Sequence, residues 1–110
     1  MSLRRERLAD QVRDLLGRCF QGGRLEDPRL QGVTITGAKI SPDLQLATVY
    51  FRLYEGHDPK EALAGLKAAS GFLKRELARG LDLRRVPELR FFLDEGLERA
   101  SNIEDLLRKL

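Results

Sequence analysis

The sequence has few of the residues that catalysis and metal binding require. Its 110 residues include one cysteine, one histidine and no tryptophan. A lone Cys19 cannot form an internal disulfide, which agrees with a reducing cytoplasm, and one cysteine with one histidine cannot build a structural zinc site. His57 lies in the stretch YEGHDP, which is typical of a surface loop rather than of a catalytic base. Walker A and GxGxxG patterns are absent too. We therefore expect no enzyme activity, no cofactor, no metal ion and no small-molecule substrate.

Long apolar runs are also missing. No stretch approaches the roughly 20 apolar residues of a membrane span, and the N-terminal MSLRRERL is not followed by the apolar segment of a signal peptide. Apolar residues make up 42% and charged residues 34% of the chain, a mixture that favours a globular protein over a disordered one. We expect one cytoplasmic domain over residues 1–110 that does not contact a membrane.

Positive charge is concentrated in two segments, although the formal net charge is only +3. Residues 1–24 carry six basic and three acidic side chains, and residues 62–90 carry seven basic and three acidic ones. Residues 25–61 and 91–110 each carry two more acidic than basic side chains. This distribution favours an anionic partner that contacts the two basic segments.

Several segments have helical periodicity or helix-start signals. A first helix is expected to be capped by Ser2 and to end before Gly22. A second helical region begins with the strong start signal Asp58-Pro59. A short C-terminal helix, at about residues 101–109, is expected to begin at Ser101. The apolar face of the first helix consists of Leu8, Val12, Leu15, Leu16 and Cys19, and that of the last consists of Ile103, Leu106, Leu107 and Leu110.

Three further segments have the composition of β-strands. Residues 32–40 are rich in β-branched side chains, and Gly37 among them indicates a bulge. Residues 44–54 alternate apolar and polar side chains, and the intervening turn SPDL predicts an antiparallel hairpin. A third strand is expected after Pro87. These elements predict an α+β fold in which helices cover one face of a three-stranded sheet.

The pair Ser70-Gly71 interrupts a region that is otherwise helical. Glycine lowers helix stability by about 1 kcal/mol relative to alanine, and serine competes for backbone hydrogen bonds. We therefore expect two helices, 58–69 and 71–80, that meet at an angle, with Ser70 as the cap of the second. Free backbone N–H groups at this new helix start would attract an anion such as phosphate. The core-facing register continues through the pair as Leu63, Leu66, Ser70, Leu73 and Leu77.

Cations surround this expected break. Lys67, Lys74 and Arg75 lie three or four residues from Gly71 and so share a helix face with it. With Ser70 and Gly71 they form the predicted RNA-binding site, a cradle for a sugar-phosphate backbone. The basic segment continues through Arg79, Arg84 and Arg85, and the first helix offers a second basic group, Arg4, Arg5 and Arg7.

Two other interpretations of this region remain open. The Ser-Gly pair could serve only the packing of the helix on the sheet, in which case the cations are a solvated face. The chain also has just seven phenylalanine and tyrosine residues, and Tyr50 is the one expected to be exposed on a strand. Contacts to the backbone of structured RNA therefore fit the sequence better than a base-stacking platform does.

The order of the chain's segments resembles the bacterial ribosome-binding factor A family. The matching segments are RRERLADQVRDLL, DPRL, GVTITGAKISPDLQLATVYF, ASGFLKRELARGLDLRRVPELRFFLDEGLE and IEDLLRKL, which span almost the whole chain. The resemblance implies a single type II KH-like domain with topology αββααβ. It also implies that an Ala-x-Gly kink, here Ala69-Ser70-Gly71, replaces the GxxG loop of ordinary KH domains.

The resemblance implies a function as well. Members of this family bind the small (30S) ribosomal subunit late in its assembly, assist maturation of the 5′ region of 16S rRNA, matter most in the cold and are not enzymes. We expect a ribosome-biogenesis factor, monomeric in free solution, whose partners are the small subunit or its precursor and 16S rRNA. The alternatives are a protein–protein interaction domain without direct RNA binding and a general single-stranded nucleic-acid-binding KH domain. Salt dependence of binding separates RNA from protein recognition.

Overall fold

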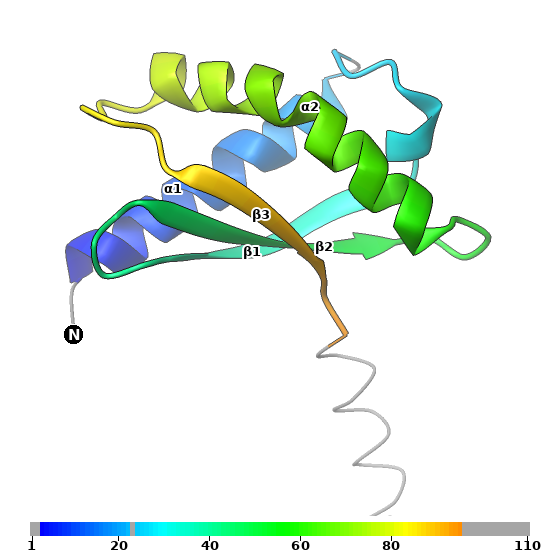
Figure 1. Cartoon of the computed structure of the whole chain (residues 1–110), viewed down its shortest axis with the longest axis horizontal. Coiled ribbons are helices and arrows are strands. Elements are labelled where there is room, and N and C mark those ends of the chain that lie inside the picture. Colours follow the sequence, from blue (N-terminus) through cyan, green and yellow to red (C-terminus); the bar gives the residue numbers. More distant parts are fainter. Residues whose placement is uncertain (1–2, 23, 96–110) are drawn as a thin grey trace, which may run out of the picture.

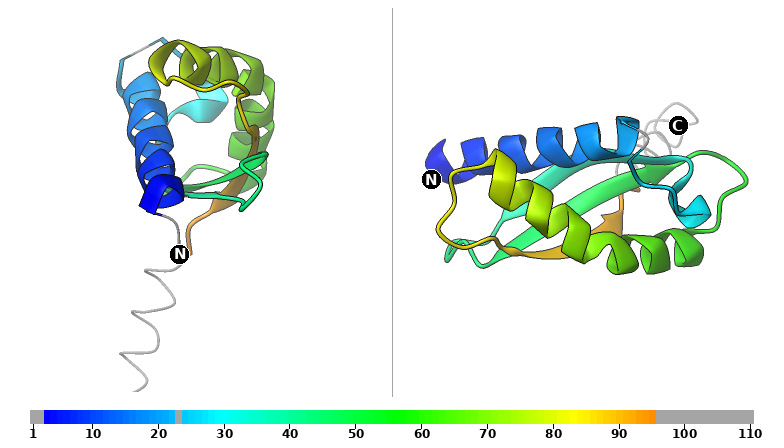
Figure 2. Two further views of the ribbon diagram at one scale, coloured as in Figure 1. Left: turned by 90° about the vertical axis from the view of Figure 1, so that its left-hand side faces the viewer. Right: turned by 90° about the horizontal axis from the view of Figure 1, so that it is seen from above.

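Two helices lie on one face of a three-stranded sheet (Figures 1 and 2). The structure is a computed structural model that describes residues 3–22 and 24–95. The elements in chain order are α1 (Leu3–Gln21), the 3-10 turn η1 (Pro28–Leu30), β1 (Val33–Ile40), β2 (Leu46–Leu53), α2 (Pro59–Gly80) and β3 (Glu88–Leu93). The expected Ser2 cap and the expected helix at about 101–109 lie outside the described residues. Within the described part, neither helix has the length and apolar character needed to cross a membrane.

β2 is the central strand, with β1 on one side and β3 on the other. β1 and β2 are antiparallel, whereas β3 runs parallel to β2. Because a parallel pair needs a crossover connection, α2 is required to carry the chain back across the sheet. Ile35 pairs with Phe51 and Gly37 pairs with Tyr50, which leaves Thr36 as the extra residue of a bulge. The predicted hairpin and the bulge beside Gly37 are therefore confirmed.

The core lies between the two helices and the inner face of the sheet. The alternate residues Ala47, Val49 and Phe51 of β2 have no exposed surface. Leu63 is the exception among the apolar residues predicted to face the core from α2, because 38% of its surface is exposed. The other predicted core residues of both helices are buried: Leu8, Val12, Leu15, Leu16, Cys19, Leu66, Leu73 and Leu77.

α2 is one unbroken helix through Ser70 and Gly71. The prediction of two helices that meet there, with Ser70 capping a new helix start, was therefore wrong. The Ser70 hydroxyl instead donates a hydrogen bond to the Leu66 carbonyl oxygen at 3.1 Å, as a serine inside a helix does. Burial of Leu66 and Leu73 on either side stabilises the helix by about 1.5–3 kcal/mol each, which exceeds the roughly 1 kcal/mol cost of Gly71. The ribbon of α2 still changes direction along its length in both Figures 1 and 2.

Both ends of α2 lie where the sequence signals place them. The Asp58 carboxylate accepts a hydrogen bond from the Lys60 amide at 2.9 Å and so caps the first turn. Gly80 is the last helical residue. A Cβ atom at Gly80 would collide with the Leu15 side chain of α1, so the absence of a side chain allows the two helices to approach closely at this point.

Cys19 has the environment of a structural residue, and this leads to a first prediction. Only 4% of its surface is exposed, and burial raises the pKa of its thiol. Because the thiolate is the reactive form, we expect slow modification by a disulfide reagent in the native protein and fast modification in urea. Cys19→Asp should lower the unfolding free energy by at least about 2 kcal/mol, measured by urea titration. Fast native modification, or a Cys19→Asp variant as stable as the wild type, would contradict this role.

Candidate nucleic-acid interface

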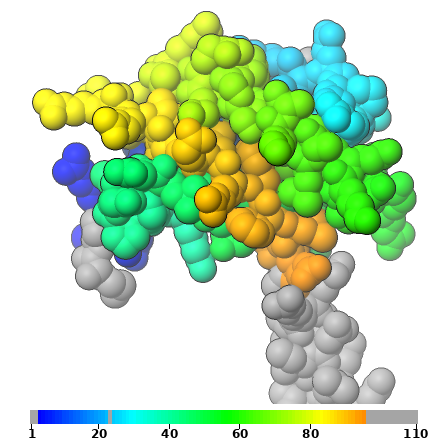
Figure 3. All heavy atoms as spheres, in the orientation of Figure 1, coloured from blue at the N-terminus to red at the C-terminus, as the bar shows by residue number. Residues whose placement is uncertain are grey.

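A groove of about 360 Å³ runs between α2 and β3. β3 is an edge strand of the described sheet, so no strand of that sheet pairs with its outer edge. α2 packs beside this strand. In Figure 3, α2 and β3 lie next to each other across the front of the molecule. The α2 residues that line the groove recur at steps of four and three, which places them on one face of the helix. The lining residues are Leu63, Lys67 and Ser70 from α2, and Leu89, Arg90, Phe91 and Phe92 from β3.

The groove combines exposed cations with exposed apolar surface. Lys67 and Arg90 are both exposed and stand on opposite walls. Leu63 and Phe92 expose 38% and 51% of their surfaces. Cations that bind phosphate oxygens, next to apolar groups that contact sugars and bases, are the usual composition of a surface that binds nucleic acid. Within residues 3–22 and 24–95 no group of three His, Cys, Asp or Glu side chains is placed to hold a metal ion.

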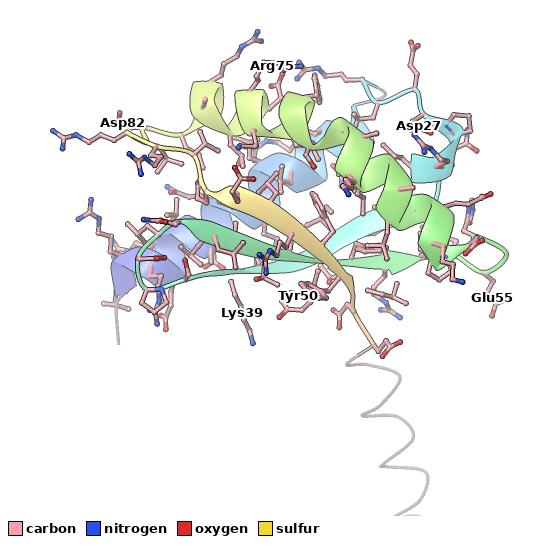
Figure 4. All side chains as sticks on the ribbon, in the orientation of Figure 1. Asp27, Lys39, Tyr50, Glu55, Arg75 and Asp82 are labelled. Carbon is pink, nitrogen blue, oxygen red and sulfur yellow. The ribbon has the colours of Figure 1, made fainter. Side chains whose placement is uncertain are left out.

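Gly71 lies in the exposed part of α2, beyond the groove. A Cβ atom there would meet only the Nη1 atom of Arg75, at 3.5 Å. Figure 4 shows Arg75 on the outer side of α2, away from the sheet. Because N–H groups inside an α-helix bond to carbonyl oxygens four residues earlier, Gly71 offers a bare backbone surface but no free helix-terminal amides. The sequence-based expectation of such amides was wrong, while the expected proximity of Gly71 and Arg75 is confirmed.

Lys74 differs from Lys67 and Arg75, the other two cations predicted to surround Gly71. Its Nζ atom lies 2.7 Å from the Glu88 carboxylate at the start of β3. About a third of the Lys74 side chain remains exposed. The ion pair joins α2 to the edge strand, so the carboxylate already balances much of the Lys74 charge. Lys67 and Arg75 are the cations of the predicted trio for which no such ion pair is found among the described residues.

The remaining predicted residues lie at the end of the molecule where α1 begins and where the chain passes from α2 to β3 (Figures 1 and 2). Arg79 is exposed, and its nearest carboxylate is that of Glu76, at 3.8 Å. Arg24 also pairs with Glu76, and its hydrogen bonds lower the pKa of that carboxyl. Arg84, Arg85, Arg4 and Arg7 are exposed, and Arg5 is half-buried. The predicted site residues thus fall into two groups. One group lies in the groove or on the adjoining surface of α2. The other forms what we call the basic end, which consists of Arg4, Arg5, Arg7, Arg79, Arg84 and Arg85.

Sequence reasoning missed the β3 wall of the groove. Arg90 had no assigned role, and Phe91 or Phe92 was expected in the core without a choice between them, although strict alternation along β3 places Phe91 toward the core and Phe92 outside. That alternation was the available signal. The signal could not reveal that β3 is an edge strand beside α2, because strand order depends on the path of the whole chain.

Comparison with known proteins identifies what this arrangement is similar to. A family model described as "Ribosome-binding factor A" matches residues 4–107. Ribosome-binding factor A from Anaeromyxobacter sp. (strain K) is 48% identical over 105 residues, which cover 94% of this chain and 75% of that protein. The crystal structure of ribosome-binding factor A from Thermus thermophilus superposes with a TM-score of 0.73 at 31% identity and covers 81% of this chain and 93% of that one. A homology model of the Thermus thermophilus protein, fitted into a cryo-EM map of its complex with 30S, has a TM-score of 0.66 at 31% identity and covers 78% of this chain and 90% of that one.

Proposed function

Because the chain belongs to the ribosome-binding factor A family, we propose that it binds the small (30S) ribosomal subunit or its precursor and assists late maturation of 16S rRNA, including its 5′ region. Support comes from the family match over residues 4–107 and from the similar Thermus thermophilus protein that has been fitted into a 30S complex. The protein acts as a binding factor in ribosome biogenesis rather than as an enzyme. It works in the cytoplasm, as a monomer when free, and matters most in the cold.

The groove between α2 and β3 is the proposed contact with rRNA. Lys67 and Arg90 on its two walls bind phosphate oxygens, and Arg75 extends the positive surface along α2. Gly71 has no side chain of its own to block the approach of a sugar-phosphate backbone, and the Arg75 guanidinium lies beside it. The single observation that carries this proposal is the placement of exposed cations on both walls of one groove.

The domain is proposed to be a variant of the type II KH fold with a bend at Ala69-Ser70-Gly71. The sheet has a last strand parallel to its central strand, and the long helix before that strand carries the Ala-x-Gly sequence. The hydrogen bond from Ser70 to the Leu66 carbonyl supports a bend at this position, because such bonds often bend helices.

Co-sedimentation with purified small subunits, with large subunits as the control, tests the function. We expect binding to small subunits only, with affinity that falls steeply as salt rises, because phosphate contacts release counterions. A protein–protein interaction domain would show a shallow salt dependence instead. Binding to both subunits, or to neither, would contradict the proposed function. Competition by short single strands at low concentration would favour a general single-strand binder.

Gly71 gives a second prediction, in which stability and binding change in opposite directions. Gly71→Ala should raise the unfolding free energy by about 0.5–1 kcal/mol, because alanine favours helix and the new Cβ has room. The same methyl group should weaken small-subunit binding several-fold by blocking backbone approach. The matched control is Gly17→Ala in α1, where a Cβ meets nothing within 4 Å. It should gain similar stability and leave binding unchanged. If Gly71→Ala binds as tightly as the control variant, Gly71 has no role in recognition.

A further inference from the structure

The face of the sheet opposite the helices carries two cross-strand rows with different chemistry. Figure 4 shows Lys39 and Tyr50 on the side of the sheet away from α2. Side chains two residues apart along a strand share a face, so successive rows are about 7 Å apart. The first row is Lys39, Thr48 and Arg90, and the second is Gly37, Tyr50 and Phe92.

The second row places the half-buried ring of Tyr50 beside the exposed ring of Phe92. The ring centroids of Tyr50 and Phe92 are 6.4 Å apart, with 39° between the ring planes. Phe92 is 51% exposed. On the other side of Tyr50, Gly37 has no side chain to cover the ring, and its Cβ position would lie 4.0 Å from Tyr50 Cδ2. Aromatic rings that are at least partly exposed on a sheet surface are what an unpaired base stacks on.

The first row supplies positive charge next to the rings. Lys39 and Arg90 are both exposed and lie on either side of Thr48. The Lys39 Nζ atom lies 5.8 Å from the centroid of the Tyr50 ring, so the lysine charge reaches the aromatic row. A phosphate group beside a stacked base would therefore meet one or both cations.

Two carboxylates next to these rows along the described part of β3 and its end are bound within the protein. Glu88, at the start of β3, pairs with Lys74 at 2.7 Å. Asp94, just beyond β3, accepts a hydrogen bond from the Thr36 hydroxyl at 2.7 Å. Neither row itself contains an acidic residue. The face is thus complementary to an anionic partner that also has flat rings.

We infer that this sheet face is a second contact surface, which binds unpaired nucleotides of RNA. A base stacks on Tyr50 and Phe92, and its neighbouring phosphate binds Lys39 and Arg90. Arg90 and Phe92 also line the groove beside α2, so one RNA can pass from the groove onto the sheet. The inference rests on the proposed function and adds a recognition of single-stranded segments to the contacts with structured rRNA.

Binding of a fluorescein-labelled eight-nucleotide oligoadenylate, measured by anisotropy at low salt, tests the inference. Tyr50→Leu should weaken this binding about 10-fold, because removal of one stacking ring costs roughly that much. Tyr50→Phe keeps the ring and should bind as the wild type does. Tyr54→Leu is the matched control, since Tyr54 is 72% exposed and lies beyond the two rows. Phe92→Leu is a second variant, used if urea titration shows that Tyr50→Leu is much less stable than the wild type.

Each other outcome overturns the inference and separates it from the proposed function. If the wild-type protein sediments with small subunits but does not bind the oligonucleotide, the sheet face is not an RNA surface and the proposed function stands. If Tyr50→Leu and Phe92→Leu both bind the oligonucleotide as tightly as the wild type does, the same conclusion follows. If Tyr50→Leu and Phe92→Leu lose affinity for small subunits but keep it for the oligonucleotide, the sheet face contacts a ribosomal protein instead. Failure to sediment with small subunits would refute the proposed function itself.

Discussion

Replacement of Phe51 with alanine is expected to lower the unfolding free energy by about 3–5 kcal/mol. Phe51 lies in the central strand, has no exposed surface and is the largest fully buried side chain of the described residues. Its removal forfeits the burial of the ring and leaves a cavity between the sheet and both helices. Since domains of this size are stable by only about 5–15 kcal/mol, the variant should unfold at much lower urea concentration, as followed by circular dichroism.

Phe92→Ala provides the control for this prediction. Phe92 has the same side chain and lies in the adjoining strand, but half of its surface is exposed. Its replacement should change the unfolding free energy by no more than about 1 kcal/mol. Similar losses in the two variants would mean that the sheet does not have the described inner and outer faces.

Reversal of charge at Lys67 and Arg75 is expected to produce the largest loss of binding. In Lys67→Glu/Arg75→Glu, two cations become anions beside the groove and beside Gly71. The slope of log affinity against log salt should flatten by about two units, because each cation that contacts a phosphate contributes about one. Small-subunit affinity should fall on the order of 10²-fold or more at physiological salt. Filter binding or co-sedimentation over a series of salt concentrations measures both quantities.

The control must change net charge equally without touching the groove. Lys60 and Arg18 are exposed and lie outside the groove lining. Lys60→Glu/Arg18→Glu should therefore weaken binding far less, through long-range repulsion alone, which salt screens. Equal losses in the two double variants would place the interface elsewhere, and the basic end with Arg4 and Arg84 would be the next candidate. Lys74 is left unchanged because its reversal would also break the contact with Glu88.

The sequence predicts much of the fold because local signals agree with tertiary packing. The apolar periodicity of α1, the bulge beside Gly37 and the cap at Asp58 are each determined by residues within a few positions. The break at Ser70-Gly71 was predicted on local cost alone. Packing of Leu66 and Leu73 against a common core outweighs that cost and keeps the helix continuous.

The candidate site could be predicted only on its helical side. Helical spacing identifies Lys67 and Ser70 as neighbours, and the structure places both in the groove. Helical spacing gives no information on which strand lies beside these two residues. The pairing of Lys74 with Glu88 and the contribution of Arg90 depend on the parallel crossover, which brings β3 next to α2. Such long-range placement has no signature in a window of neighbouring residues.

The parallel pairing of β3 with β2 also sets an order for biosynthesis. β3 can join the sheet only after α2 has crossed it, and pairing between distant segments is slow because the entropy of loop closure must be lost first. Segments near the N-terminus leave the ribosome first, so a nascent chain displays the cations of α2 before residues 89–92 supply the second wall of the groove. An incomplete chain therefore has the positive charge but not the shaped site. We therefore expect the proposed binding groove to form only when synthesis of the described domain is almost finished.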